Sequence, residues 1–191
     1  MKKYVMILLI AFMAVSCRTA EFGFKVIDVN GMVYDFTNRP VAHCEISLGG
    51  KYNSSTDING RFSLPRIRAG TYTITGCKKT FENYSDEVII KDKGQIIYIR
   101  MPSQSQLLNL ADEALSANNL TGAEKLVERA YQIDENNIEM LFYYATVKFR
   151  QREYDRAINL LEGAKDLGSK DVYIDKFLTV LREAQDAYQK K

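Results

Sequence analysis

The strongest constraint on the fold is a spacing of 34 residues that recurs in the C-terminal half of the chain. Apolar or small residues are repeated at this spacing, in the pairs Leu107 and Leu141, Ala111 and Ala145, Ala123 and Ala157, Val127 and Leu161, and Ala130 and Ala164. Within each copy apolar residues recur three and four positions apart, as they do on one face of a helix. The spacing therefore predicts two helical hairpins, at 104–137 and 138–171, and a closing helix over 172–189.

The N-terminal part of the chain has the period of β-strands instead. Polar and apolar residues alternate over 44–48, 70–75 and 97–101, as is typical of short strands with one buried face. Several short strands separated by turn residues favour a β-sandwich, here placed at 24–102. The sequence thus predicts an α+β protein, with the helical hairpins in residues 103–191.

One turn between two predicted strands has a specific chemistry. Asn59-Gly60 favours a tight hairpin with positive φ at both residues, so Thr56 and Arg61 are expected to flank a reversal. Asp57-x-Asn59-Gly60 is also similar to part of a calcium-binding loop. The remaining ligands and the closing glutamate of an EF-hand are absent, so the turn is the favoured interpretation and no metal site is predicted.

The first residues read as a secretory leader. Lys2 and Lys3 precede an apolar run from Val5 to Val15, which as a helix would be about 16 Å long and too short to span a bilayer. Ala14-Val15-Ser16-Cys17 resembles the lipobox of bacterial lipoproteins. That resemblance implies a signal peptide over 1–16, lipidation of Cys17 and a tether over 17–23. An ordinary secretory signal is the alternative.

Two further cysteines would enter an oxidising compartment, where a disulfide can form. Alternation places Cys44 on the inward face with Ile46 and Leu48, whereas Cys77 is out of phase with Ile74. The pattern favours a buried Cys44 that behaves as a small apolar residue, and a Cys44–Cys77 bridge stays open as the alternative.

Two family resemblances cover most of the chain. The pattern Thr-Asp-x-x-Gly-x-Phe at 56–62, followed by Gly-x-Tyr at 70–72, resembles the carboxypeptidase regulatory-like domain, a transthyretin-like sandwich. Such domains are accessory folding and binding modules in secreted and surface proteins. The segments 104–137 and 138–171 resemble tetratricopeptide repeats, and 172–189 resembles their capping helix.

Composition excludes several classes of function. The 26 basic residues include Lys2 and Lys3, which no acidic residue accompanies before Cys17, so the chain from Cys17 onward carries 24 residues of each sign. Without a concentration of basic residues, no nucleic-acid partner is predicted. The one histidine, His43, lies in a predicted strand, where a structural or surface role is favoured. We expect no enzyme and no cofactor.

The tetratricopeptide resemblance implies a groove lined by the first helix of each repeat. The matching positions are Leu108, Asn109, Asp112 and Leu115 in the first repeat, and Phe142, Tyr143, Thr146, Phe149 and Arg150 in the second. Aromatic anchors beside an arginine suit capture of a peptide or helix. The alternative is that these side chains pack on the capping helix or the sandwich.

These observations predict a non-catalytic lipoprotein that acts as a protein-binding adaptor or scaffold in the bacterial cell envelope. Arg18 after the lipidated cysteine favours, by resemblance, the outer membrane of a Gram-negative bacterium. Because two repeats form a marginal array, the helices are expected either to dock on the sandwich or to bind an envelope protein along their open face. The alternative function is glycan binding by the sandwich, for which the scattered Tyr52, Tyr72, Tyr84 and Tyr98 are the stacking candidates.

Overall fold

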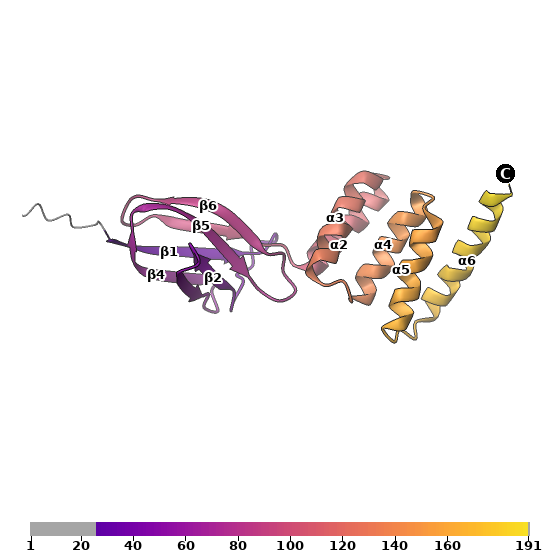
Figure 1. Cartoon of the computed structure of the whole chain (residues 1–191), viewed down its shortest axis with the longest axis horizontal. Helices are drawn as coiled ribbons and strands as arrows, with labels where there is room; N and C mark the ends of the chain where they lie inside the picture. The colour runs from indigo at the N-terminus through magenta and orange to yellow at the C-terminus, as the bar shows by residue number, and fades with distance from the viewer. Residues whose placement is uncertain (1–25, 191) are drawn as a thin grey trace, which may run out of the picture.

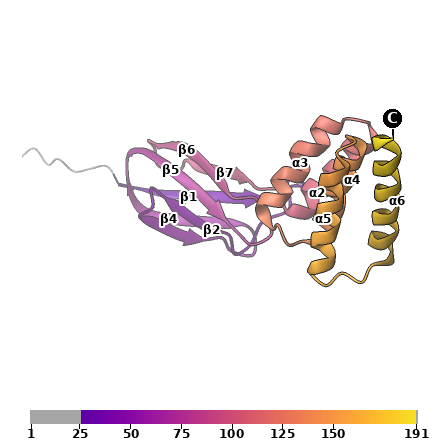
Figure 2. The same cartoon turned by 45° about the vertical axis from the view of Figure 1, so that its right-hand side comes forward.

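The computed structural model describes residues 26–190 and contains a β-sandwich followed by a group of helices (Figures 1 and 2). The α+β architecture predicted from the sequence is thereby confirmed. The predicted signal peptide and the lipidation site at Cys17 lie outside the described residues.

Within residues 26–190 the sandwich has seven strands: β1 (Val26–Tyr34), β2 (Glu45–Leu48), β3 (Tyr52–Ser55), β4 (Arg61–Arg68), β5 (Gly70–Cys77), β6 (Tyr84–Ile90) and β7 (Ile96–Arg100). One sheet has the order β4-β1-β7 and the other β3-β2-β5-β6. All neighbouring strands are antiparallel except β1 and β7, which are parallel. Alternate apolar residues of both sheets, such as Val29 of β1 and Leu48 of β2, form one buried cluster.

The turn at 57–60 differs from the predicted hairpin. β3 and β4, which it connects, belong to different sheets, and of its two central residues Gly60 alone has positive φ, at 73°. Asp57 Oδ1 accepts hydrogen bonds of 2.8 Å from the N–H groups of Asn59 and Arg61. The reversal therefore depends on the Asp57 side chain, which explains why a turn that crosses between sheets carries a hairpin-like sequence.

The cysteines are both free thiols, with Cys44 buried and Cys77 exposed. Cys44 Sγ lies 3.6 Å from Met101 Sδ, and burial raises the pKa of the thiol to about 11. His43 is not in a strand as predicted but in the turn before β2, with a φ of 53° and an exposed side chain.

The described helices are α2 (Gln104–Ser116), α3 (Leu120–Ile133), α4 (Ile138–Arg150), α5 (Tyr154–Asp166) and α6 (Val172–Gln189). The first residues of α2, α4 and α6 are each 34 positions apart, so α6 occupies the place of a first helix in a third unit. Ala123 and Ala130 of α3, and Ala157 and Ala164 of α5, are fully buried. These small side chains let the helices of each hairpin lie close together, as the repeat spacing predicts.

The two parts meet end to end, and each has its own hydrophobic cluster. Ser103 caps α2 in a capping box with Gln106, whose side-chain amide also donates to Thr37 Oγ1 at 3.3 Å. Arg129 of α3 makes a bidentate ion pair with Glu82, with N–O distances of 2.8 and 2.7 Å. The sandwich thus contacts the start of the helical array and leaves its length uncovered.

A comparison of two glycines tests the turn. Gly60 and Gly94 both have positive φ, but a Cβ on Gly60 would lie 2.5 Å from the Val33 carbonyl oxygen, whereas a Cβ on Gly94 would meet nothing within 4 Å. We expect Gly94→Ala to lower the free energy of unfolding by about 1 kcal/mol through backbone strain alone. Gly60→Ala should cost about 3 kcal/mol, because overpacking is added. Urea denaturation followed by tyrosine fluorescence measures both, and equal losses would contradict the close approach.

Candidate functional site

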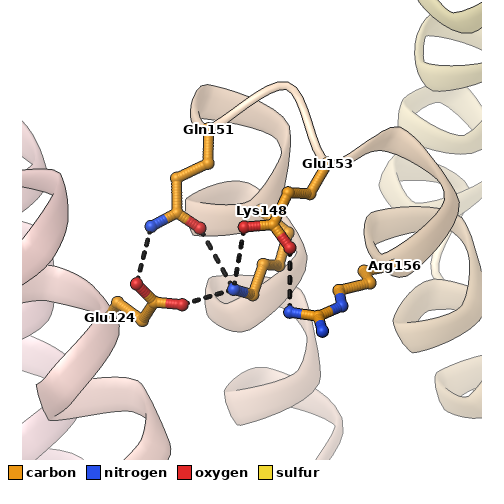
Figure 3. A network of polar contacts seen from close by, with 5 residues as sticks. All are labelled: Glu124, Lys148, Gln151, Glu153 and Arg156. Atoms are coloured by element: carbon orange, nitrogen blue, oxygen red, sulfur yellow. Dashed lines mark hydrogen bonds and ion pairs between the residues drawn. The ribbon is translucent and has the colours of Figure 1, made fainter.

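The most buried charge of the helical part lies between the two hairpins. Lys148 of α4 has a side chain only 3% exposed, and its Nζ donates to Glu124 of α3, to Gln151 at 3.1 Å and to Glu153 at 3.2 Å (Figure 3). Arg156 of α5 donates to the second oxygen of Glu153 at 2.9 Å. The five side chains therefore connect α3, α4 and α5.

The ionised forms of this network stabilise one another. Hydrogen bonds from Lys148 and Gln151 lower the pKa of Glu124 below its usual value. Burial opposes the charge of Lys148, but its bonds to Glu124 and Glu153 outweigh burial and raise the pKa of the ammonium group. All three donor hydrogens of the ammonium group have acceptors, so Lys148 is held as a structural cation and is not available as a nucleophile or base.

A groove runs beside this network, between α3 and α5 and above α4. It consists of two adjoining hollows of about 750 and 760 Å³ that share Glu128, Tyr131, Tyr144 and Leu160. The rings of Tyr131 and Tyr144 meet edge to face with centroids 6.1 Å apart. We call this surface the α3–α5 groove. It combines apolar side chains with an aromatic pair, as small binding surfaces commonly do.

In the first hollow of the α3–α5 groove the basic side chains are ion-paired, whereas three acidic side chains are not ion-paired with any described residue. Its basic residues, Lys148 and Arg156, are both bound to Glu153. Its acidic residues, Glu128, Glu135 and Asp166, have no ion-pair partner among residues 26–190. Burial and the charge of Glu128 raise the pKa of Tyr144, so its hydroxyl stays protonated. The second hollow adds Lys125 and Arg129, and Arg129 is bound to Glu82.

The partner-binding residues predicted from the sequence lie on another surface, the face formed by the first helices α2, α4 and α6. Leu108 and Leu115 are buried in the helical core, and Asp112 and Arg150 are exposed. Phe142, Tyr143, Thr146 and Phe149 are half-buried. The structure therefore does not gather the predicted set into one open groove, and partner binding by these residues stays a prediction.

Phe177 of α6 explains why this face is partly closed. Its ring lies 5.5 Å from that of Phe142 and 5.6 Å from that of Phe149, measured between centroids. Phe142 and Phe149 of α4 thus pack on the last helix, in agreement with the alternative interpretation of the sequence. The α3–α5 groove could not be predicted from the sequence, because Tyr131, Tyr144 and Leu160 come from three helices and share no local motif.

The tyrosines proposed as sugar-stacking residues do not share one surface. Tyr52 and Tyr72 form an edge-to-face pair 6.2 Å apart in the four-stranded sheet, where Tyr84 also lies. These three rings pack against the sandwich core, whereas Tyr98 is exposed on β7 of the other sheet. The four tyrosines therefore do not form one aromatic platform.

Two further properties bear on function. Between residues 26 and 190, histidine, cysteine and acidic side chains nowhere form a group of three or more that could hold a metal ion. In the same part of the chain no helix combines the length and the apolar character that crossing a membrane requires.

Comparison with known proteins gives one family match. The model described as anaphase-promoting complex, cyclosome, subunit 3, matches residues 116–187, which include most of the helical part. No curated protein matches the chain. The fold is therefore a β-sandwich joined to tetratricopeptide-like helical hairpins.

The solved structures named here are distant in sequence. A type II cohesin–X-dockerin complex from Acetivibrio cellulolyticus is 21% identical with a TM-score of 0.36, and the match covers 42% of this chain and 60% of that one. A putative carbohydrate-binding protein from Bacteroides uniformis is 12% identical, with a TM-score of 0.35 and coverage of 41% and 42%. One from Pseudomonas aeruginosa is 13% identical, with a TM-score of 0.33 and coverage of 46% and 93%.

Replacing the buried lysine tests the network. We expect Lys148→Met to lower the free energy of unfolding by about 2 kcal/mol at pH 7, less than a fully buried pair would lose because Glu124 is partly exposed. Because the folded-state pKa of Glu124 is lowered, its contribution is present above the ordinary glutamate pKa and disappears as the pH falls through the folded value.

The difference between the parent and Lys148→Met should therefore shrink in acid, as measured by urea titrations at pH 7 and pH 3. Lys165→Met is the control, because its ion pair with Asp175 is exposed on both sides and should contribute little. An unchanged difference at pH 3 would contradict the role assigned to Glu124.

Proposed function

We propose that this protein is a non-catalytic adaptor of the bacterial cell envelope, and that it binds a partner polypeptide in the α3–α5 groove. The observation that carries the proposal is the groove itself, a hollow with an aromatic pair on a tetratricopeptide-like scaffold. Helical hairpins of this kind present extended surfaces to partners. The buried network of Lys148 fixes the positions of the three helices that form the groove.

The chemistry of the groove selects the partner. Tyr131, Tyr144 and Leu160 suit apolar side chains. Glu128 and Asp166 carry charges that no ion pair with a described residue offsets, so a partner with basic residues beside its apolar ones is favoured. A helical or extended segment with lysine or arginine flanking leucine or an aromatic residue meets both requirements.

The same proposal includes lipid anchoring in the outer membrane through Cys17. Its support is the lipobox-like segment and the layout of the molecule: β1 begins at the end of the sandwich that lies away from the helices (Figure 1). An anchor that precedes β1 would hold the sandwich near the membrane and present the helices beyond it. Several acyl chains on Cys17 would make this attachment stable.

Charge reversal in the groove tests partner binding. The partner is first trapped in envelopes with a photo-reactive residue at Asn159, which lines the first hollow. We expect Glu128→Lys combined with Asp166→Lys to lower the yield of this cross-link at least ten-fold, because a basic partner is then repelled. Asp112→Lys combined with Glu113→Lys, on the exposed side of α2, is the matched control. Loss of binding in the control alone would move the site to the face of α2, α4 and α6.

Substitution of the lipidation site tests anchoring. Cys17→Ala should leave the leader uncleaved by the lipoprotein route and remove incorporation of labelled fatty acid. Cys77→Ala, which removes an exposed cysteine far along the chain, should leave incorporation unchanged. Metabolic labelling followed by immunoprecipitation measures both, and labelling that persists in Cys17→Ala would contradict the anchor.

A further inference from the structure

The last helix has an apolar surface that no described residue fully covers. Ile174, Leu178 and Leu181 are the buried side of α6. A separate stripe consists of Tyr173, Phe177, Val180, Ala184 and Ala187, which we call the α6 stripe. Its spacings of four, three, four and three residues are those of a seam between two paired helices. Tyr173 is 72% exposed and Val180 48% exposed.

The other side of α6 is fixed to α5. Asp175 forms an ion pair with Lys165 at 2.7 Å, and Arg182 forms one with Glu162 at 2.9 Å. In the repeat alignment Asp175 occupies the position of Leu141, which is buried in α4. At this position α6 therefore lacks the apolar side chain that α4 buries against its neighbours. In Figures 1 and 2 α6 is also the outermost element at the end of the array away from the sandwich.

The size of the residues along the α6 stripe makes it complementary to itself in one orientation. If two copies of α6 cross antiparallel with Val180 at the two-fold axis, Phe177 of each lies opposite Ala184 of the second copy. Tyr173 likewise lies opposite Ala187. Large residues then face small ones in the layers on both sides of Val180, whereas parallel pairing would set Phe177 against Phe177 and leave a gap at Ala184.

The charges beside the stripe select the same orientation. Lys176 and Glu183 are exposed on the same edge of the stripe, seven residues apart. In the antiparallel pair Lys176 of one copy faces Glu183 of the second copy, and the symmetry repeats the contact. Lys176 is otherwise near the ring of Tyr173, at 5.8 Å from its centroid. Phe142 and Phe149 of α4 support Phe177 from beneath, so the stripe is held in place.

We infer that the protein forms a two-fold symmetric dimer through antiparallel pairing of the α6 stripes. This goes beyond the proposed function and does not depend on it, because no residue of α6 lines the α3–α5 groove. Each copy keeps its own groove in the dimer. The dimer thus offers two equivalent grooves to a partner, and partners with two segments gain avidity from it.

Cross-linking of the full chain in its envelope tests the inference. Val180→Cys in a Cys77→Ser background places a thiol at the symmetry axis, while Cys44 stays buried, and Cys77→Ser alone controls for cross-links through Cys17. Mild oxidation should give a band at twice the chain mass on a non-reducing gel, and mass spectrometry should find only this chain in it. Asp186→Cys, on an exposed part of α6 away from the stripe, is the control and should give little dimer.

Charge reversal then tests the orientation. In the Val180→Cys background, Lys176→Glu or Glu183→Lys alone should lower the dimer yield at least five-fold, because each creates two like-charged contacts. The two reversals together restore opposite charges and should return the yield to near its starting value. All three positions are exposed, so folding is kept, as circular dichroism would verify.

Three results would overturn the inference. Failure of Val180→Cys to cross-link would exclude the pairing, and cross-linking to a different protein would show that a partner of another kind covers the stripe. A double reversal that stays as weak as the single ones would exclude the antiparallel orientation. None of these results bears on the α3–α5 groove, which is tested separately at Asn159.

Discussion

A helical hairpin cannot bury its apolar surface by itself, and the arrangement of this protein follows from how each hairpin is covered. The hairpin of α2 and α3 is covered by α4, and the hairpin of α4 and α5 is covered by α6. Ala123 and Ala157 are fully buried in these contacts, so the helices approach closely where the repeat requires it. The sandwich has a separate core and meets the array only at its first end.

Two buried polar side chains fix the register of this stack. Lys148 joins the first hairpin to the second through Glu124 and Glu153. Gln104 donates to the carbonyl oxygens of Ala130 and Asp134, both at 2.9 Å, and accepts from Asn137. Among residues 26–190 no buried side-chain polar atom lacks a hydrogen-bond partner. Because buried ion pairs gain little net stability, the value of these contacts lies in excluding other registers, a role we assign to Lys148.

Periodicity in the sequence predicts the helices, the strands and their buried faces. Contacts between side chains that are far apart in the sequence could not be predicted. The 34-residue spacing predicts the hairpins and the start of α6, and alternation predicts the inward Cys44. The network of Lys148 could not be predicted, because the first repeat has Ala114 at that position and gives no sign of a cation. Phe177 of α6 partly closes the predicted binding surface, so the alternative that the sequence left open, packing on the last helix, holds for Phe142 and Phe149.

Within residues 26–190 the array leaves two surfaces without a partner, the α6 stripe at one end and the α3–α5 groove along its side. An array of two hairpins and one helix has two ends, and the sandwich occupies one of them through polar contacts such as Arg129 with Glu82. The other end of the described array is α6, where Asp175 lies at the repeat position that Leu141 has in α4. In the proposed dimer, the α6 stripe of a second copy covers the apolar surface of α6. The α3–α5 groove, which lies between the ends, is then left for a partner that is not part of the fold.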